Sequence, residues 1–295
     1  MRAAAPIPAF VNPTAGSADA AREAIAGDAR FELREIPPAE LQRAIADAVA
    51  AGATRVLVSG GDGTVANAAA ALAGSDIELA VLPGGTLNHF ARDAGIPVDD
   101  LPAALDAAAN GRTVPVDVGY VNGRLFVNTS SVGVYVTFVR LRERLEPYLG
   151  YLLGSLVAAI RLLFHVRGFR VHMRVDDEER EYRTPLLFVG VGERELDRQG
   201  LGARVEGGRS GLHMMIVRGR TRSRLTALAV AGITHGLRAA ARTSALDAEV
   251  VDEFTIAMPR PLGYVAIDGE LVRMRAPLHY RIARGVLTVV APPPG

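Results

Sequence analysis

The sequence contains no lysine and no cysteine, so all 33 of its basic residues are arginine. A Walker-type phosphate loop requires a lysine after its glycines, and lysine nucleophiles or Schiff bases require the amine, so these sites are excluded. The missing cysteine excludes thiol catalysis, disulfide bonds and cysteine–metal sites. No apolar run reaches the roughly 18 residues that cross a bilayer, so we expect no membrane-spanning helix.

A glycine-rich turn follows the β-branched run at residues 55–59 and precedes an alanine-rich helical stretch at residues 65–72. Strand, glycines and helix in this order are typical of phosphate binding, because glycine lets backbone N–H groups approach an anion closely. Asp62 would repel a bare phosphate, so it indicates a divalent cation or water between the two. An ordinary tight turn is the alternative. The turn consists of Gly60, Gly61, Asp62, Gly63 and Thr64.

A second glycine-rich turn, Pro83-Gly84-Gly85-Thr86-Leu87-Asn88, follows the buried-strand pattern of residues 78–82. Thr86 is placed to cap the helix that continues to Arg92, and a capped helix alone would explain this turn. Asn12, at the end of the first expected strand, suits a nucleotide edge or ribose, although alone it would indicate a turn. Because parallel strands deliver their carboxyl ends to one sheet edge, the turns are expected to converge on one ligand.

The pattern of expected secondary structure changes near residue 118. Before it, strand-like runs alternate with helical stretches, which predicts a parallel sheet covered on both faces. After it, strand-like runs dominate and predict an antiparallel second domain. The expected helices are residues 18–26, 40–51, 65–73 and 101–110. The expected later strands are residues 125–128, 169–175, 186–191, 212–217, 253–258, 264–267 and 286–290.

Charge is distributed unevenly along the chain. Residues 1–118 carry 8 arginines against 15 acidic residues, whereas residues 119–295 carry 25 against 17. A basic second half suits an anionic lipid surface, unless the arginines are spread over solvated faces. Residues 139–166 and 222–242 combine arginines with apolar stripes, so these expected helices either lie in a membrane interface or cover the second domain.

Taken together, the motifs resemble the diacylglycerol kinase and sphingosine kinase superfamily of lipid kinases. The resemblance implies an α/β nucleotide-binding domain with a parallel sheet at residues 1–118 and an antiparallel β-sandwich lipid-substrate domain at residues 119–285. It also implies that the last strand, about residues 286–295, returns to the first domain. The motifs that carry it are residues 12–16, 60–64, 83–88 and 87–97 and Asp268-Gly269-Glu270.

The resemblance implies a bacterial ATP-dependent lipid kinase that uses Mg²⁺ and phosphorylates a hydroxyl of diacylglycerol or a related lipid. Asp268 is then the general base, Glu270 a metal or nucleotide contact, and Asp62 a Mg²⁺ contact through water. Without the family, Asp268 and Gly269 would be read as a β-turn. Arg92 lies on the helix after the second glycine turn and could reach phosphate in a chain without lysine, and a surface salt bridge is the alternative. The expected nucleotide contacts are Asn12, Gly60, Gly61, Asp62, Gly63, Thr64, Gly84, Gly85, Thr86, Asn88 and Arg92.

The expected partner is a lipid held in a membrane surface, which implies a cytoplasmic protein peripheral to the inner face of that membrane. No nucleic-acid partner is expected, because aromatic residues make up only 5% of the chain and show no stacking pattern. The oligomeric state is open, with a homodimer among the alternatives.

Three positions depart from the family pattern. Ser17 stands where relatives often carry a basic residue, Val191-Gly192 stand where asparagine is usual, and residues 206–211 lack an Asp-Gly pair that could hold a structural cation. The first departure supports an alternative function as a non-catalytic nucleotide- or lipid-binding regulator. A soluble NAD kinase-like enzyme would share the GGDG turn, but the sequence lacks the later Asn-Glu motif expected of it.

Overall fold

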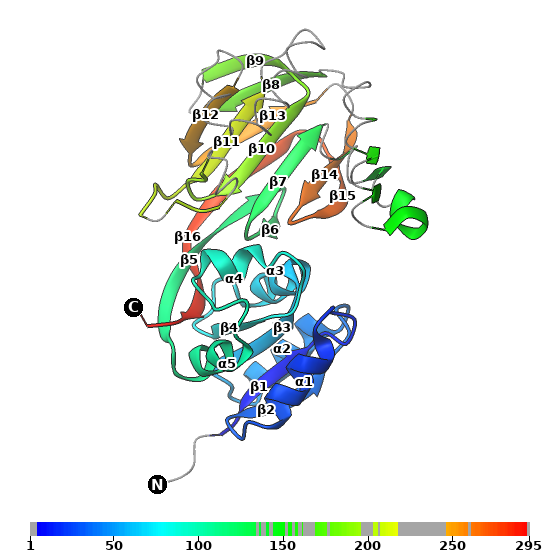
Figure 1. Ribbon diagram of the computed structural model, residues 1–295. Coiled ribbons are helices and arrows are strands. Elements are labelled where there is room, and N and C mark those ends of the chain that lie inside the picture. Colours follow the sequence, from blue (N-terminus) through cyan, green and yellow to red (C-terminus); the bar gives the residue numbers. More distant parts are fainter. Residues whose placement is uncertain are drawn as a thin grey trace. The chain divides into compact units, whose positions relative to one another are not determined.

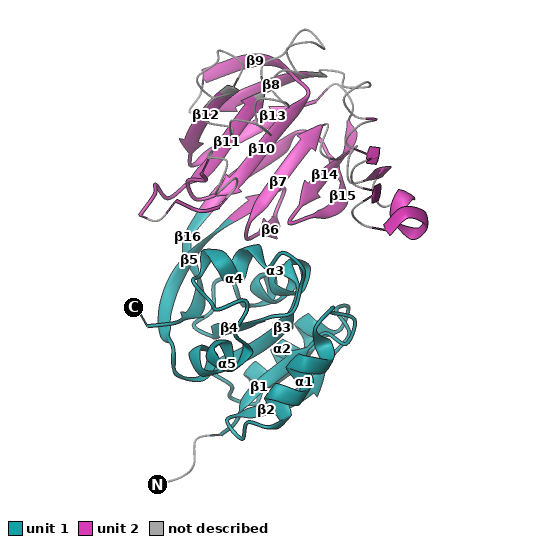
Figure 2. Ribbon diagram, in the orientation of Figure 1, with its two compact units in different colours: residues 1–118, 283–295 teal, residues 119–282 magenta. Residues whose placement is uncertain are grey.

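A computed structural model describes residues 5–133, 136, 140–141, 144–150, 153–154, 157–158, 161, 169–175, 178–195, 203–205, 207–217, 246–258 and 261–293. The chain forms two compact units, unit 1 with residues 1–118 and 283–295 and unit 2 with residues 119–282 (Figure 2). The expected helix at residues 222–242 lies outside the described residues, as does much of residues 139–166. None of the helices in the described ranges is both long and apolar enough to span a bilayer.

Unit 1 is a parallel sheet with the strand order β2-β1-β3-β4-β16 and helices on its faces (Figure 1). Helix α1 packs beside α5, and α3 packs beside both α2 and α4. Its strands are β1 (Ile7–Val11), β2 (Phe31–Glu35), β3 (Arg55–Gly60), β4 (Glu78–Pro83), part of β5 (Arg112–Val121) and part of β16 (Leu278–Ala291). Its helices are α1 (Ala18–Ala26), α2 (Leu41–Ala50), α3 (Asp62–Leu72), α4 (His89–Asp93) and α5 (Leu101–Asn110).

The sequence pattern of unit 1 follows from this burial. The central strands β1, β3 and β4 are nearly continuous apolar runs because helices cover both of their faces, and Phe10, Val58 and Leu82 are fully buried. Helix α2 is instead buried along one stripe, with Leu41 and Ile45 one turn apart.

Unit 2 is a sandwich of two antiparallel sheets. One sheet has the order β12-β11-β10-β7-β14-β15, and the other continues from β16 through β13 and β8 to β9. Their facing residues, among them Leu187 and Val265 from the first and Met173 and Ile256 from the second, form one apolar core. The remaining strands are β6 (Arg124–Phe126), β7 (Thr129–Gly133), β8 (Phe169–Val175), β9 (Glu178–Thr184), β10 (Leu186–Val191), β11 (Leu212–Val217), β12 (Leu246–Val251), β13 (Glu253–Ala257), β14 (Leu262–Ile267) and β15 (Glu270–Arg275).

The predicted fold class, a parallel α/β part followed by an antiparallel sandwich, is confirmed. Helix α3 starts at Asp62 instead of residue 65, so the end of the first glycine turn is already helical. Strand β16 starts at Leu278 instead of residue 286, with buried Leu278 and Tyr280 alternating with exposed His279 and Arg281. Charged outward residues hid β9 from the sequence pattern, as in its Glu-Glu-Arg-Glu start.

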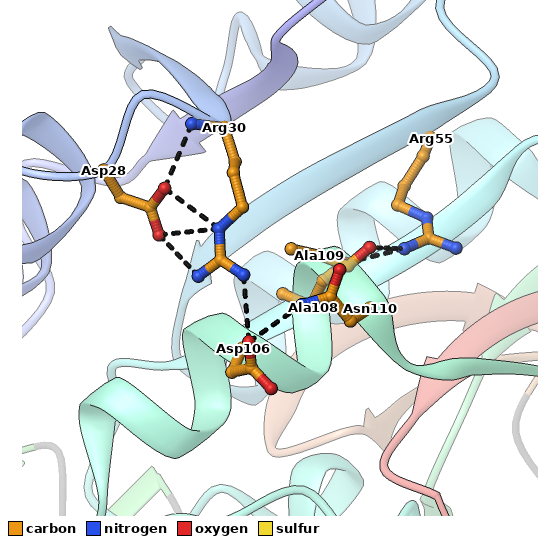
Figure 3. Close-up of polar contacts among 7 residues, drawn as sticks. All are labelled: Asp28, Arg30, Arg55, Asp106, Ala108, Ala109 and Asn110. Carbon is orange, nitrogen blue, oxygen red and sulfur yellow. Dashed lines mark hydrogen bonds and ion pairs between the residues drawn. The ribbon is translucent and has the colours of Figure 1, made fainter. Parts of the chain in front are cut away.

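Two arginines hold helix α5 against neighbouring segments of unit 1 (Figure 3). Arg30 donates to the carboxylates of Asp28 and Asp106, and its guanidinium holds the pKa of Asp28 below its usual range. Arg55 lies on β3, donates to Glu78 over 2.6 Å, and also donates to the last-turn carbonyls of Ala108 and Ala109. These carbonyls have no partner within the helix, so Arg55 satisfies its C-terminal end.

We expect Arg55→Met to lower the free energy of unfolding by about 2 kcal/mol, because charge-assisted hydrogen bonds to two carbonyls and one carboxylate are lost. Urea denaturation measures this change. Arg43→Met is the control, since Arg43 is 88% exposed and lies 4.0 Å from its carboxylate partner Asp47. Equal effects of the two substitutions would contradict the assignment.

Candidate functional site

The two glycine turns of unit 1 are in direct contact, backbone against backbone. They follow the adjacent parallel strands β3 and β4, and the N–H of Gly84 donates to the carbonyl of Gly60 over 3.0 Å. A Cβ on Gly85 would lie 2.5 Å from the Cα of Gly61, and one on Gly84 would lie 3.0 Å from the Cα of Gly60. A side chain at either position would therefore push the turns apart.

Asn12, directly after β1, joins the same edge of the sheet. Its Nδ2 donates to Oγ1 of Thr64 over 3.0 Å, and its Oδ1 accepts from the N–H and the hydroxyl of Thr14. Thr64 is buried in the first turn of α3. A Cβ added to Gly60 would lie 2.6 Å from the Cβ of Thr64. The carboxyl ends of β1, β3 and β4 thus bring the three N-terminal motifs together.

Asp62 ties the first glycine turn to the helix after the second. It is the first residue of α3, and its Oδ1 accepts from the N–H of Phe90 over 3.0 Å. That N–H lies in the first turn of α4, where backbone donors have no partner within the helix. The carboxylate therefore caps α4 from the first residue of the neighbouring helix α3.

The prediction that Thr86 caps α4 is wrong. The N-cap position belongs to Asn88, which has a left-handed backbone with φ of 50°, and Thr86 is exposed. The Asn88 amide closes its own turn, because its Oδ1 accepts from the N–H of Gly85 over 2.9 Å and its Nδ2 donates to the Gly85 carbonyl over 2.8 Å. Asparagine tolerates this conformation better than threonine, which is β-branched.

Arg92 lies in the last turn of α4, next to the second glycine turn. Its Nε donates to the carbonyl of Leu87 over 3.2 Å. Within the described ranges no carboxylate forms an ion pair with it, so the salt-bridge alternative has no partner there. Its contact with phosphate stays a prediction.

In unit 2, Asp268 stands at the tip of the β14–β15 hairpin. Asp268 and Gly269 have φ of 45° and 87°, as a two-residue turn of type I′ requires, so the β-turn reading of this pair is correct. The Asp268 carboxylate also accepts three backbone hydrogen bonds. Its Oδ2 accepts from the N–H of Val127, and its Oδ1 accepts from the N–H groups of Asn128 and Thr129, each over 2.9 Å. We call residues 127–129 the amide cradle, because their three N–H groups fix the Asp268 carboxylate and stabilise its negative charge.

Glu270 follows at the first position of β15. Its Oε2 pairs with Nη2 of Arg124 over 3.0 Å, and the side chains of Glu270 and Arg124 are 60% and 48% exposed. Among the described residues no group of three or more His, Asp or Glu side chains is placed to hold a metal ion. The predicted metal role of Glu270 is therefore not supported by a cluster of ligands.

Residues 6–121 match the family model of the diacylglycerol kinase catalytic domain. The match covers 116 of the 295 residues of the chain, nearly all of them in unit 1. A Cronobacter sakazakii protein named "Probable lipid kinase YegS-like" is 39% identical over 157 residues, which are 51% of this chain and 51% of that protein. A diacylglycerol kinase of Mycobacterium tuberculosis is 37% identical over 123 residues, which are 39% of this chain and 40% of that protein.

The chain thus spans about half the length, or less, of these curated relatives. The whole fold also resembles the crystal structure of a diacylglycerol kinase from Bacillus anthracis, with a TM-score of 0.70 and 20% identity over 98% of this chain and 97% of the other. The segment that matches the family model contains the glycine turns, Asn12 and Arg92. Asp268 and Glu270 lie outside the matched residues.

Sequence reasoning missed three polar residues that unit 2 buries around the amide cradle. Asn128, Arg194 and His213 are 4%, 3% and 6% exposed. Asn128 opens a polar run, Asn128-Thr129-Ser130-Ser131, directly after the apolar residues 125–127, and that abrupt change was the available signal.

Ser130 shares a 3.0 Å hydrogen bond with Tyr280, whose burial raises the pKa of its hydroxyl, so this pair stays neutral.

We expect Gly85→Ala to lower the free energy of unfolding by about 1–3 kcal/mol, because the new Cβ would clash with the Gly61 backbone, which cannot rotate away as a side chain can. Guanidinium denaturation measures the loss. The matched control is Gly16→Ala in the first motif, where a Cβ would meet nothing within 4 Å. A Gly85→Ala protein as stable as the control would show that the turns are not in contact.

Proposed function

We propose that this protein is a lipid kinase that transfers the γ-phosphate of ATP to a hydroxyl of diacylglycerol or a related lipid. In this proposal, residues 1–118 with residues 286–295 bind the nucleotide, and residues 119–285 bind the lipid. The main support for it is the convergence of three motifs at one sheet edge of the segment that resembles the diacylglycerol kinase catalytic domain. The Asn12–Thr64 hydrogen bond and the paired glycine turns bring these motifs together.

The nucleotide phosphates would lie along this edge, against the backbone N–H groups of the two turns and the N-terminus of α3. Glycines leave the N–H groups of the turns uncovered by side chains, and the helix dipole adds positive potential. The expected contacts are those predicted from sequence, with Arg92 supplying the charge that a lysine supplies in other phosphate sites.

A magnesium ion fits Asp62 chemically. Its Oδ1 accepts the Phe90 N–H, and no described residue donates a hydrogen bond to Oδ2. A carboxylate oxygen is the hard ligand that Mg²⁺ prefers, and one or two carboxylates with substrate phosphates usually suffice. Asp62 would hold the ion directly or through water, and the ion would offset the charge of the transferring phosphoryl group.

Asp268 would act as the general base. It would take the proton from the lipid hydroxyl while that oxygen bonds to the γ-phosphorus and ADP leaves. The three hydrogen bonds from the amide cradle fix the position of this carboxylate, and a general base has to be held in place relative to the hydroxyl that it deprotonates. Glu270 would contact the cation or nucleotide, since exchanging its exposed Arg124 partner costs little.

The test is transfer of labelled γ-phosphate from ATP to a panel of lipids in mixed micelles, with and without Mg²⁺. We expect Mg²⁺-dependent labelling of at least one lipid, and a fall in kcat of about 10²–10⁴-fold in Asp268→Asn. Asp76→Asn removes the same charge from an exposed loop and should keep full activity.

Thermal melting of each variant separates lost chemistry from lost folding. Nucleotide binding without labelling of any lipid would contradict the proposed kinase activity. Labelling that survives in Asp268→Asn would keep the activity and refute the base assignment.

A peripheral contact with the membrane would bring the lipid within reach. Residues 144–150 are helical, and the nearby apolar side chains Tyr148 and Leu153 are 85% and 58% exposed. Apolar groups on a helix that carries arginine are typical of interfacial binding.

We expect the double variant Tyr148→Ser/Leu153→Ser to bind anionic vesicles at least about tenfold more weakly, because about 1.5–3 kcal/mol of burial is lost per large apolar residue. Sedimentation with phosphatidylglycerol vesicles measures this affinity. Leu262→Ser, an exposed apolar position on β14, is the control and should bind as the wild type does. Equal binding by all variants would place the membrane contact elsewhere.

A further inference from the structure

Arg194 is a charged side chain buried in unit 2, with 3% exposure. Its Nε donates to the carbonyl of Val191 over 3.0 Å, and its Nη2 donates to the carbonyl of Asn128 over 3.2 Å. Desolvating a guanidinium is costly unless hydrogen bonds compensate, so this contact is a specific feature of the fold.

The carbonyl that Arg194 holds belongs to the amide cradle of Asp268. The C=O of Asn128 and the N–H of Thr129 are the two ends of one planar peptide unit and point in opposite directions. Arg194 binds the carbonyl end of this unit, and Asp268 accepts from its N–H end over 2.9 Å. The N–H of Val191 donates to the same carbonyl over 3.0 Å. Rotation of this one peptide plane would therefore move the proposed base.

The surroundings keep the guanidinium in place. A Cβ on Gly190 would lie 2.6 Å from Cγ of Arg194, so only glycine leaves the path for this side chain. The backbone N–H of Arg194 donates to Nδ1 of His213 over 2.9 Å, which requires an unprotonated Nδ1. Burial lowers the pKa of His213, which favours that neutral form.

We propose that Arg194 is a positioning residue for Asp268, acting through the peptide plane between Asn128 and Thr129. The inference rests on the proposed function for its catalytic meaning. Arg194 itself touches neither the nucleotide nor the reacting hydroxyl in this scheme.

Arg194→Lys is the informative variant. Lysine keeps the charge and most of the stem but replaces the planar fork with a single ammonium, so it cannot hold both carbonyls in the same geometry. Arg204→Lys is the matched control, because Arg204 also donates to the Val191 carbonyl, over 3.3 Å, and lies opposite Arg194 in a β-bridge.

The first measurement is hydrogen–deuterium exchange of the backbone amides of residues 127–129, which needs no activity. We expect these amides to exchange about tenfold faster in Arg194→Lys than in the wild type or in Arg204→Lys. Unchanged exchange would overturn the inference whether or not the protein is a kinase. Faster exchange throughout both variants would also overturn it, by showing general loosening of unit 2.

The second measurement is steady-state kinetics on the labelled lipid. Arg194→Lys should lower kcat by about 10²-fold while the KM for ATP stays within about twofold, because a base displaced by about 1 Å loses rate and not nucleotide binding. Wild-type kcat, or an equal fall in Arg204→Lys, would overturn the inference.

Gly190→Ala displaces the guanidinium without deleting it and should lower kcat in the same way. It keeps the test decisive if Arg194→Lys folds poorly. If the wild type labels no lipid, the proposed function fails, and the exchange experiment still decides whether Arg194 holds the cradle.

Discussion

The backbone contact between the two glycine turns is the constraint on which the candidate nucleotide site depends. With Gly60 and Gly61 lying directly against Gly84 and Gly85, no side chain can separate β3 from β4 at their carboxyl ends. Only at this distance can Asp62 reach across to the first turn of α4. Close packing of the two turns therefore requires glycine whether or not a ligand binds. The same absence of side chains would leave backbone N–H groups accessible to a phosphate.

Local signals made much of unit 1 predictable. Apolar runs indicated the buried parallel strands, alanine-rich stretches indicated the helices, and glycine turns marked the strand ends. Each of these signals is contained in a few consecutive residues. The cap of α4 was not predictable in this way. Thr86 fits the local rule for a cap, but the donor of Phe90 is satisfied by Asp62, which lies 28 residues earlier in the chain.

Unit 2 shows the same division between local and distant information. The Asp268-Gly269 pair was recognisable as a hairpin tip, because its turn chemistry is contained in two residues. Its carboxylate binds amides 139–141 residues away, and no sequence spacing encodes that cradle. Buried Arg194 was equally hidden, since its neighbours along the chain, Glu193 and Glu195, suggest a solvated loop. Charged strands such as β9 were missed because their partners, and not their composition, define them.

Strand β16 is synthesised long after its partner β4, and this delay affects how the nascent chain folds. This strand pairs with β4, placing Thr288 beside Glu78 and Val289 beside Leu79, yet all of unit 2 separates the two strands in the chain. At ribosomal rates of about 5–20 residues per second, β4 waits roughly 10–40 s for its neighbour. An open strand edge invites pairing with other chains. The nascent protein is therefore most exposed to aggregation after its first helices have formed and before its last strand emerges.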